Sequence, residues 1–373
     1  MNIFLFLSLY SSLILPTLNL KLNKTLIYVF SLTFLLVISL IRDPLSPPDT
    51  FNYLPAIESG TGNWFNTISP TFGFIVNFLR NIVGLDTLTT LQVINLIPFL
   101  CIFISSLILD NPIFLPIYLS SETFSLLSFN AIRQGLAIGF LTLALSIFIK
   151  NLLSKKNYLQ SYNFYIFITF LIASINSHPS SLIFILIFMI TFFGYKYKKT
   201  LTTLKIKKGV LIYTLLFLLL IITIFYLQPL IISFLLRRGS IPFNIKYLSS
   251  INMDFGGNHF SSIYRISIMF LVYLYNKSIV KKLKNPNEVI KNIYDLNKII
   301  HFTFIPIIMV TLFSPPLILS RLSHFYIIPL FLSFYLTNKI YPGKRLFIHN
   351  LIILVGILTY TSNSVLSILV AKI

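Results

Sequence analysis

Apolar runs, each long enough to cross a lipid bilayer, follow one another along this sequence with short polar gaps between them. The hydrocarbon core of a bilayer is roughly 30 Å thick, and a helix of about 20 residues crosses it. Hydrophobic residues make up 56% of the chain and charged residues 10%, a balance that soluble domains do not have. We therefore predict an all-α polytopic membrane protein with about 11–13 transmembrane helices, in which residues 1–373 form one membrane domain.

The polar gaps set the limits of the predicted spans and leave no room for a separate soluble domain. The spans are 3–20, 25–41, 71–84, 87–109, 112–128, 130–149, 163–177, 179–195, 209–231, 261–276, 299–314, 317–338 and 346–371.

The distribution of charge predicts the orientation of these spans. A net charge of +20 could indicate a nucleic-acid partner, but the lysines cluster in short gaps between apolar runs, which is the pattern of cytoplasmic loops. We therefore expect no nucleic acid, and we expect the gaps at Lys24, Lys150 and 196–208 to be cytoplasmic. The loops 42–70 and 237–260 then face the outside.

Two counts of the crossings disagree between residues 70 and 150. The count that starts at the N-terminus and the count that starts at Lys150 differ by one crossing. One segment is therefore expected to be broken or re-entrant, either 71–84, which polar residues interrupt, or 112–128, which contains prolines. Irregular backbone at membrane depth persists where it is buried in protein or lines a cavity.

The outer loop 42–70 holds the carboxylates that a chemical site would use. Three of the nine acidic residues lie in it, Asp43, Asp49 and Glu58, together with the only tryptophan. Carboxylates are scarce elsewhere in the chain, so chemistry that needs one is expected in this loop.

Arginines inside predicted spans indicate a bound anion. Arg133 opens the span 130–149 ahead of several small residues, which let another helix approach closely. Arg321 and His324 share one helical face of the span 317–338 by their i, i+3 spacing. An arginine within the hydrocarbon costs about 2.5–3.5 kcal/mol on insertion scales, so it normally faces a cavity, a partner or an anion. No carboxylate lies near Arg321 in the sequence, so a bound anion is the expected partner.

His178 marks the start of a helix that faces the outside, because Pro179 suits the first helical position. A helix N-terminus has N–H groups without helical partners and a positive partial charge, which suits phosphate. The same field favours a neutral imidazole, which could accept a proton. His178 is therefore expected to bind phosphate or to act as a base; the alternative is a histidine that only caps the helix.

Three further arginines are weaker candidates. Arg237 and Arg238 lie in the outer loop 237–260 and are expected to be solvated or to steer a substrate rather than to act in catalysis, while Arg265 lies in the span 261–276. The sequence has no metal-binding histidine motif and no phosphate-binding glycine loop, and its single cysteine, Cys101, excludes a disulfide framework. We predict no metal site and no cofactor.

The order of these features resembles the EpsG-like branch of the Wzy polysaccharide polymerases. The resemblance is carried by four short patterns, which run from about residue 25 to 340. They are an outer-loop aspartate and tyrosine (Asp49 and Tyr53 in DTFNY), an arginine that opens a span (Arg133), a histidine before a serine-rich helix start (His178 in NSHPSS) and a late arginine before an aromatic pair (Arg321).

This resemblance implies an integral-membrane glycosyltransferase with a GT-C-like helical architecture in the bacterial cytoplasmic membrane. It would polymerise oligosaccharide repeat units carried on undecaprenyl diphosphate at the outer face, as in capsule or O-antigen (lipopolysaccharide) biosynthesis. Arg133 and Arg321, with His324, would hold the diphosphate, and Asp49 or His178 would be the general base. A flippase and a chain-length regulator are implied partners.

Two other functions remain open at this point. An O-antigen ligase or a polyprenyl-phosphate-sugar transferase would share the architecture and differ in the acceptor. A lipid-linked oligosaccharide flippase would move the same lipid without lengthening its glycan. A transporter usually carries acidic residues within its spans and a repeated half, and here Glu122 is the one carboxylate in an apolar segment that we place within the membrane.

Overall fold

The computed structural model describes residues 24–41, 50–60, 69–112, 114–119, 131–153, 162–178, 288–312 and 323–340, with single residues and short groups at 45, 124, 127 and within 180–189 and 271–281. The elements in this part of the chain are helices, and no strand occurs in it. The predicted all-helical fold is confirmed to this extent. The predicted spans 3–20, 209–231 and 346–371 lie outside the described residues.

Several helices coincide with predicted spans. α2 (Lys24–Ile41), α6 (Thr87–Leu109), α9 (Ile132–Leu153) and α10 (Tyr162–Ser177) begin and end within a few residues of the predicted limits. Among the described helices, α6 and residues 132–151 of α9 are long and apolar enough to cross a membrane. Shorter apolar stretches lie in α2, in α10 and in α17 (Ile327–Ile340). These helices are consistent with a chain that associates with a membrane.

Local sequence explains where α6 begins and ends. Asp86 is its N-cap residue and accepts a hydrogen bond from the Thr89 amide N–H at 2.9 Å, which satisfies a backbone donor that has no partner within the helix. At the other end Asp110 adopts the left-handed conformation, with φ 52°. Its N–H bonds to carbonyls of the last turn, an arrangement that ends a helix.

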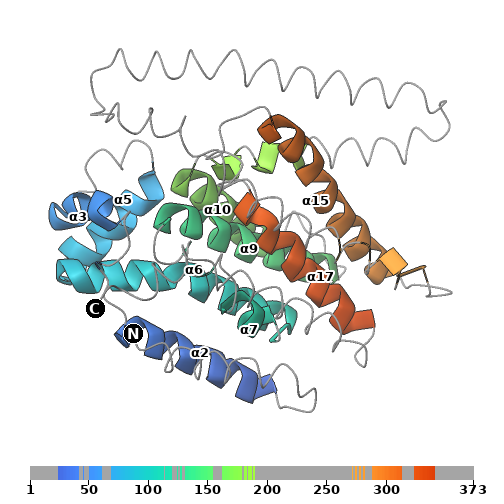
Figure 1. Ribbon diagram of the computed structural model, residues 1–373, viewed down its shortest axis with the longest axis horizontal. Helices are drawn as coiled ribbons and strands as arrows, with labels where there is room; N and C mark the ends of the chain where they lie inside the picture. Colours follow the sequence, from blue (N-terminus) through green and yellow to red (C-terminus); the bar gives the residue numbers. More distant parts are fainter. Residues whose placement is uncertain are drawn as a thin grey trace. The chain divides into compact units, whose positions relative to one another are not determined.

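The chain divides into two compact units, which we describe separately. The first takes residues 1–183, 271–294 and 327–373, and the second takes 184–270 and 295–326. In the first unit α9 packs against both α6 and α10 (Figure 1).

Glycines on α9 allow α6 to approach closely. A Cβ atom at Gly139 would lie 3.0 Å from the Cα atom of Pro98 and 3.1 Å from its carbonyl oxygen. Gly135, one turn earlier, faces the ring of the same proline. A Cβ atom added at Gly135 would lie 3.2 Å from the Cγ atom of Pro98. Such an approach requires residues with small side chains, so the small residues that follow Arg133 have the predicted packing role.

α9 and α10 run antiparallel. Near one end of the pair the Asn163 side-chain amide donates to Oδ1 of Asn151 at 2.8 Å. Toward the other end the Ser174 hydroxyl donates to the Ala137 carbonyl at 2.7 Å. The first turn of α9 and the last turn of α10 therefore lie at the same end of the pair.

Residues 70–82 do not form a regular membrane span. The chain is α-helical in α5 (Pro70–Asn77, 8 residues) and continues as the π-helix η1 (Phe78–Ile82, 5 residues). At about 1.5 Å per residue the two together are roughly 20 Å long, which is less than the thickness of the bilayer core. Residues 70–82 thus form a short helix with an irregular second half, and the choice between 71–84 and 112–128 as the broken or re-entrant segment stays a prediction.

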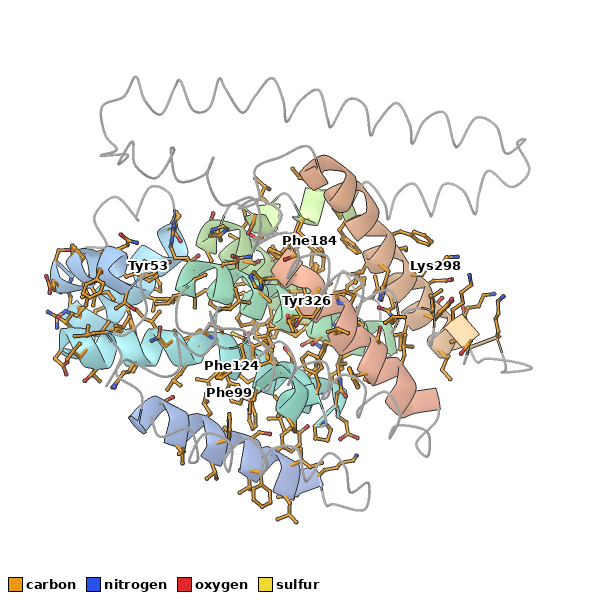
Figure 2. All side chains as sticks on the ribbon, viewed as in Figure 1. Tyr53, Phe99, Phe124, Phe184, Lys298 and Tyr326 are labelled. Carbon is orange, nitrogen blue, oxygen red and sulfur yellow. The ribbon has the colours of Figure 1, made fainter. Side chains whose placement is uncertain are left out.

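A short helix, α3 (Thr50–Glu58), lies within the predicted loop 42–70. Its side chains Tyr53, Ala56 and Ile57 are buried. Tyr53, labelled in Figure 2, packs on Phe72 of α5 with ring centroids 5.4 Å apart. The loop is thus ordered over α3 and joined to α5 by an aromatic contact.

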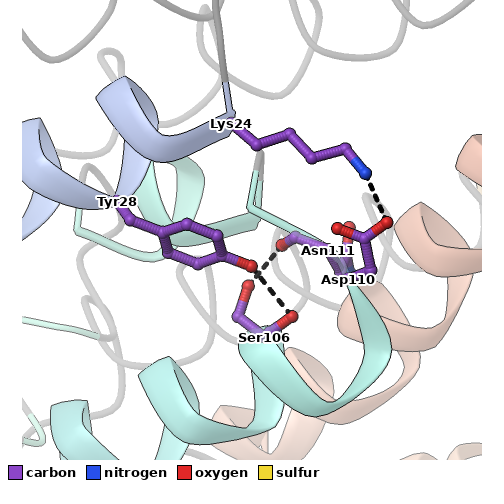
Figure 3. A network of polar contacts seen from close by, with 5 residues as sticks. All are labelled: Lys24, Tyr28, Ser106, Asp110 and Asn111. Atoms are coloured by element: carbon purple, nitrogen blue, oxygen red, sulfur yellow. Dashed lines mark hydrogen bonds and ion pairs between the residues drawn. The ribbon is translucent and has the colours of Figure 1, made fainter.

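A polar network joins the start of α2 to the end of α6 (Figure 3). Lys24 forms an ion pair with Asp110, and the Tyr28 hydroxyl donates to the Ser106 carbonyl at 3.1 Å. The Ser106 hydroxyl donates to the Asn111 carbonyl, and the Asn111 side-chain amide donates to a carbonyl of α17 at 3.3 Å. We call these five residues the Lys24 network.

α7 (Phe114–Leu119) follows this network and packs on α2 and α17. The Phe114 ring meets Phe331 of α17 edge to face, with centroids 4.9 Å apart. Most of the remaining predicted span 112–128 lies outside the described residues.

In the second unit the described residues lie mainly in α15 (Glu288–Leu312), from residue 295 onward, and in the 3-10 helix η5 (His324–Tyr326). α15 begins well before the predicted limit of the span 299–314, because charged residues such as Lys291 and Lys298 form helix readily without belonging to an apolar run. Hydropathy locates apolar runs, and a helix can extend beyond them.

Candidate functional site

Hydroxyl groups join the start of α5 to the end of α10. Ser69 donates to the Ser177 carbonyl at 2.5 Å, and Thr71 donates to the Ala173 carbonyl at 3.1 Å. Ser181, in the turn after α10, adds a third bond to this helix at 2.8 Å. The last carbonyls of a helix have no partner within it, so these hydroxyls satisfy the end of α10. We call Ser69, Thr71 and Ser181, with the carbonyls they bind, the hydroxyl junction.

The hydroxyl junction brings together two regions from which site residues were predicted. Ser69 lies at the end of the loop 42–70, and Ser177 directly precedes His178. The bonded residues are 108 positions apart in the sequence. The predicted outer loop and the predicted phosphate-binding histidine therefore meet in the first unit.

The ring of His178 is half-buried and held by Ser180. The Ser180 amide N–H donates to Nδ1 at 3.1 Å, and the Ser180 hydroxyl lies 2.6 Å from the same nitrogen. An amide N–H can only donate, so Nδ1 accepts and carries no proton; in a neutral imidazole the proton is then on Nε2. His178 thus caps the turn at Ser180, and its Nε2–H is a hydrogen-bond donor.

Arg133 lies in the first turn of α9, with its Nε and Nη1 atoms buried. Ala137 is one turn further along α9, and its carbonyl receives the hydroxyl of Ser174. His178 follows Ser174 by one turn, whereas Arg133 precedes Ala137 by one turn. Since α9 and α10 are antiparallel, Arg133 and His178 lie at the same end of the helix pair.

Arg80 and Asn81 hold the end of α3. Arg80 Nε donates to the Ile57 carbonyl at 3.1 Å and Nη1 donates to the Leu85 carbonyl at 2.6 Å. The Asn81 side-chain amide donates to the Gly60 carbonyl at 3.0 Å. A cation at a helix C-terminus also interacts favourably with the helix dipole. We call Arg80 and Asn81 the Arg80 clasp.

The Arg80 clasp was missed by sequence reasoning, which treated its two residues only as interruptions of a span. The signal was present, since two adjacent polar side chains in an apolar run must find partners. Besides the nearby Leu85 carbonyl and Asn77 side chain, their partners are the backbone carbonyls of Ile57 and Gly60 at the end of α3. No sequence pattern marks these two carbonyls. Tyr53, the predicted site residue that the structure describes on α3, packs on Phe72 of α5.

The other predicted site residues lie in the second unit or outside the described residues. His324 belongs to the second unit, where it is buried at the start of η5. Its neighbour Phe325 stacks on Phe184 of the same unit, with centroids 4.9 Å apart. The remaining predicted residues lie outside the described residues: Asp49, Arg237, Arg238, Arg265 and Arg321.

An arginine and an imidazole Nε2–H at one end of a helix pair can donate hydrogen bonds to anionic oxygens, and bonds to a charged acceptor are stronger than neutral ones. The described residues contain no group of three or more His, Cys, Asp or Glu side chains that could hold a metal ion. Comparisons with protein-family models, curated proteins and solved structures found no match to this chain.

Proposed function

We propose that this protein is a multi-pass glycosyltransferase of the bacterial cytoplasmic membrane, with a GT-C-like helical architecture. It polymerises oligosaccharide repeat units carried on undecaprenyl diphosphate at the outer face. The observation that carries the proposal is the hydroxyl junction, which joins the end of the loop 42–70 to the residue before His178. Arg133 lies at the same end of the α9–α10 pair. Groups that suit a diphosphate are thereby gathered next to the carboxylate-bearing loop.

The polar contacts of α6 support the outward orientation. The Arg80 clasp ties the end of η1 back to α3, and in the proposed topology residues 70–82 therefore begin and end on the outer side. The ion pair with Lys24 then brings the end of α6 to the cytoplasmic side. In the proposed topology the chain crosses from the loop 42–70 in α6, in the segment 112–128 and in α9, so that Lys150 is cytoplasmic. The two crossing counts then agree.

The proposed reaction transfers the growing glycan from its lipid carrier to the next repeat unit. A hydroxyl of the lipid-linked acceptor attacks the anomeric carbon of the donor glycan. A glycosidic C–O bond forms, the bond from that carbon to the diphosphate oxygen breaks, and undecaprenyl diphosphate leaves with the electron pair. Arg133 binds the diphosphate and stabilises its growing charge. Asp49 or His178 takes the proton of the hydroxyl.

Reconstitution with lipid-linked repeat units tests this function. The purified protein in liposomes receives undecaprenyl-diphosphate-linked repeats, and the glycans are separated by length. The wild type is expected to lengthen the glycan. Arg133→Lys keeps the charge but loses the planar fork that binds two phosphate oxygens at once, and is expected to reduce elongation by about 10–100-fold, the effect of losing a hydrogen bond to a charged group.

Lys150→Arg is the matched control, since Lys150 is exposed near the opposite end of α9. It is expected to leave elongation unchanged. Movement of the repeat units across the bilayer without elongation would contradict the proposal and favour a flippase. Transfer of the glycan only to an acceptor other than a repeat unit would favour a ligase.

A further inference from the structure

Two histidines of this chain are held in opposite tautomers. His301 lies one turn after Asn297 in α15, and its Nδ1 lies 2.7 Å from the Asn297 carbonyl. A carbonyl only accepts, so Nδ1 of His301 carries the proton. His178 is the reverse, because its Nδ1 accepts the Ser180 amide N–H at 3.1 Å and the proton is on Nε2. The backbone next to each ring therefore sets which nitrogen can donate.

We propose that His178 donates its Nε2–H to the diphosphate of the lipid-linked donor and is not the general base. This inference rests on the proposed function of the same site, and it leaves Asp49 as the base. A base needs an unprotonated nitrogen that can turn to the acceptor hydroxyl. In His178 that nitrogen is Nδ1, which Ser180 already holds with both its amide N–H and its hydroxyl.

Exchange of the tautomer would be costly in this setting. Ser180 is buried, so a proton on Nδ1 would leave its amide N–H facing another donor. A buried donor that loses its partner costs about 1–3 kcal/mol. An Nε2–H next to the end of α9 that carries Arg133 instead adds a second donor for the same anion. Two donors at one end of a helix pair suit a group with many anionic oxygens, which is what a diphosphate offers.

Two substitutions separate the nitrogens of the ring. His178→Asn places an amide oxygen where Nδ1 lies, and asparagine is among the best capping residues, so the bond to Ser180 is kept while the donor at Nε2 is lost. His178→Gln places an amide near Nε2, so a donor is kept while the cap is lost. Neither amide can accept a proton as a base.

The ranking of the two variants in the elongation assay distinguishes the roles. If His178 is a hydrogen-bond donor, the elongation rate of His178→Asn should fall by about 10–100-fold, while His178→Gln should keep most of the elongation activity. The pH profile of elongation by the Gln variant should match that of the wild type. Equal losses of about 10²–10⁴-fold in both variants would identify the base and overturn the inference. Full activity in the Asn variant with loss in the Gln variant would reduce His178 to a cap and also overturn it.

A spectroscopic test does not depend on glycosyl transfer. The chain has five histidines, and ¹⁵N labelling of their imidazoles with NMR detection reports which nitrogen of each is protonated. His178, assigned by its absence in His178→Asn, is expected as the Nε2–H form, with His301 as the opposite internal reference. Added inorganic diphosphate is expected to shift the Nε2 signal of His178 and leave that of His301 unmoved.

The two tests fail separately. An Nδ1–H form of His178, or no response to diphosphate, contradicts the inference even if the protein polymerises. If His178 shows the expected tautomer and responds to diphosphate but the protein does not polymerise repeat units, the proposed reaction is contradicted. Anion binding by His178 is then still supported.

Discussion

The two ends of α6 are anchored by polar contacts of different kinds. Near its start, the side chains of Arg80 and Asn81 donate hydrogen bonds to backbone carbonyls, and these hydrogen bonds are partly buried. At its end, Lys24 and Asp110 pair through side chains that are 58% and 52% exposed. The first arrangement adds side-chain hydrogen bonds to backbone carbonyls, one of which, that of Ile57, also accepts the Gly60 amide N–H. The second joins two charges that water solvates well on their own.

This difference indicates which end carries more stability. A hydrogen bond to a charged group contributes about 1.5–3 kcal/mol, and a buried carbonyl left without a partner costs a similar amount. An exposed ion pair contributes about 0–1 kcal/mol and is screened by salt. The end that holds α3 is therefore expected to be the more sensitive to substitution, although the clasp binds backbone carbonyls rather than a charged partner.

Arg80→Met should have the largest effect on this comparison. Methionine keeps the apolar stem but removes the two donors to Ile57 and Leu85, so we expect a loss of about 2–3 kcal/mol. Unfolding in detergent can be followed by reaction of the buried Cys101 with a fluorescent maleimide. Lys150→Met, at an exposed lysine, is the control. Equal stability of the two variants would show that the clasp does not anchor α3.

Gly60→Ala and Gly84→Ala sharpen the comparison, because they separate the cost of backbone strain at positive φ from the cost of a steric clash with Asn81. Both glycines have positive φ, 64° and 78°, which costs an L-residue roughly 1–2 kcal/mol. At Gly60 a Cβ atom would also lie 2.7 Å from Oδ1 of Asn81, whereas at Gly84 it meets nothing within 4 Å. We expect the Gly60 variant to lose about 1 kcal/mol more, measured by the same thiol reaction. Equal losses would argue that the Asn81 contact is loose.

Lys24→Met tests the opposite end of α6. The expected loss is below about 1 kcal/mol, and high salt should remove the difference from the wild type. Asp110→Asn should behave in the same way, because asparagine tolerates the left-handed conformation, and the double variant should be no less stable than either single one. A loss as large as that of Arg80→Met would reverse the ranking of the two ends.

The smallest effect is expected at the cap of α6. The hydroxyl and amide N–H of Thr89 bond to the Asp86 carboxylate and hold the pKa of that carboxyl below its usual value. Because the folded pKa is lowered, the contribution of Asp86 to stability is present above the unfolded pKa and is lost as the pH falls through the folded pKa.

Asp86→Asn keeps a capping side chain that does not titrate. The stability difference between wild type and variant should therefore shrink as the pH is lowered through the acidic range, as measured by Cys101 labelling of samples unfolded in denaturant at each pH. A difference that stays constant with pH would mean that the Thr89 bonds do not favour the charged carboxylate.

The helices that sequence predicted best are those in which local signals agree. α6 is predominantly apolar and carries no charged residue, and Asp86 begins it with a capping side chain, so hydropathy and capping place the same start. α15 was predicted too short because its first turns are polar, and polarity does not prevent helix formation. The segment 71–84 was one of two candidates for an irregular span, because the crossing counts disagree and polar residues interrupt it. The π-helix in it was not predicted, since no pattern for it is visible in the sequence.

Of the candidate site, sequence alone identified residue types that are expensive in a membrane and therefore need a reason to be there, above all Arg133 and His178. It did not determine what surrounds them. The bond from Ser69 to Ser177 joins residues far apart in the chain, and the bond from Ser180 to Nδ1 of His178 depends on the turn that follows α10. Hydropathy and capping act within one segment and can be read from it, whereas hydrogen bonds between segments exist only once packing has brought their backbones together. Tertiary structure alone therefore decided which nitrogen of His178 holds the proton.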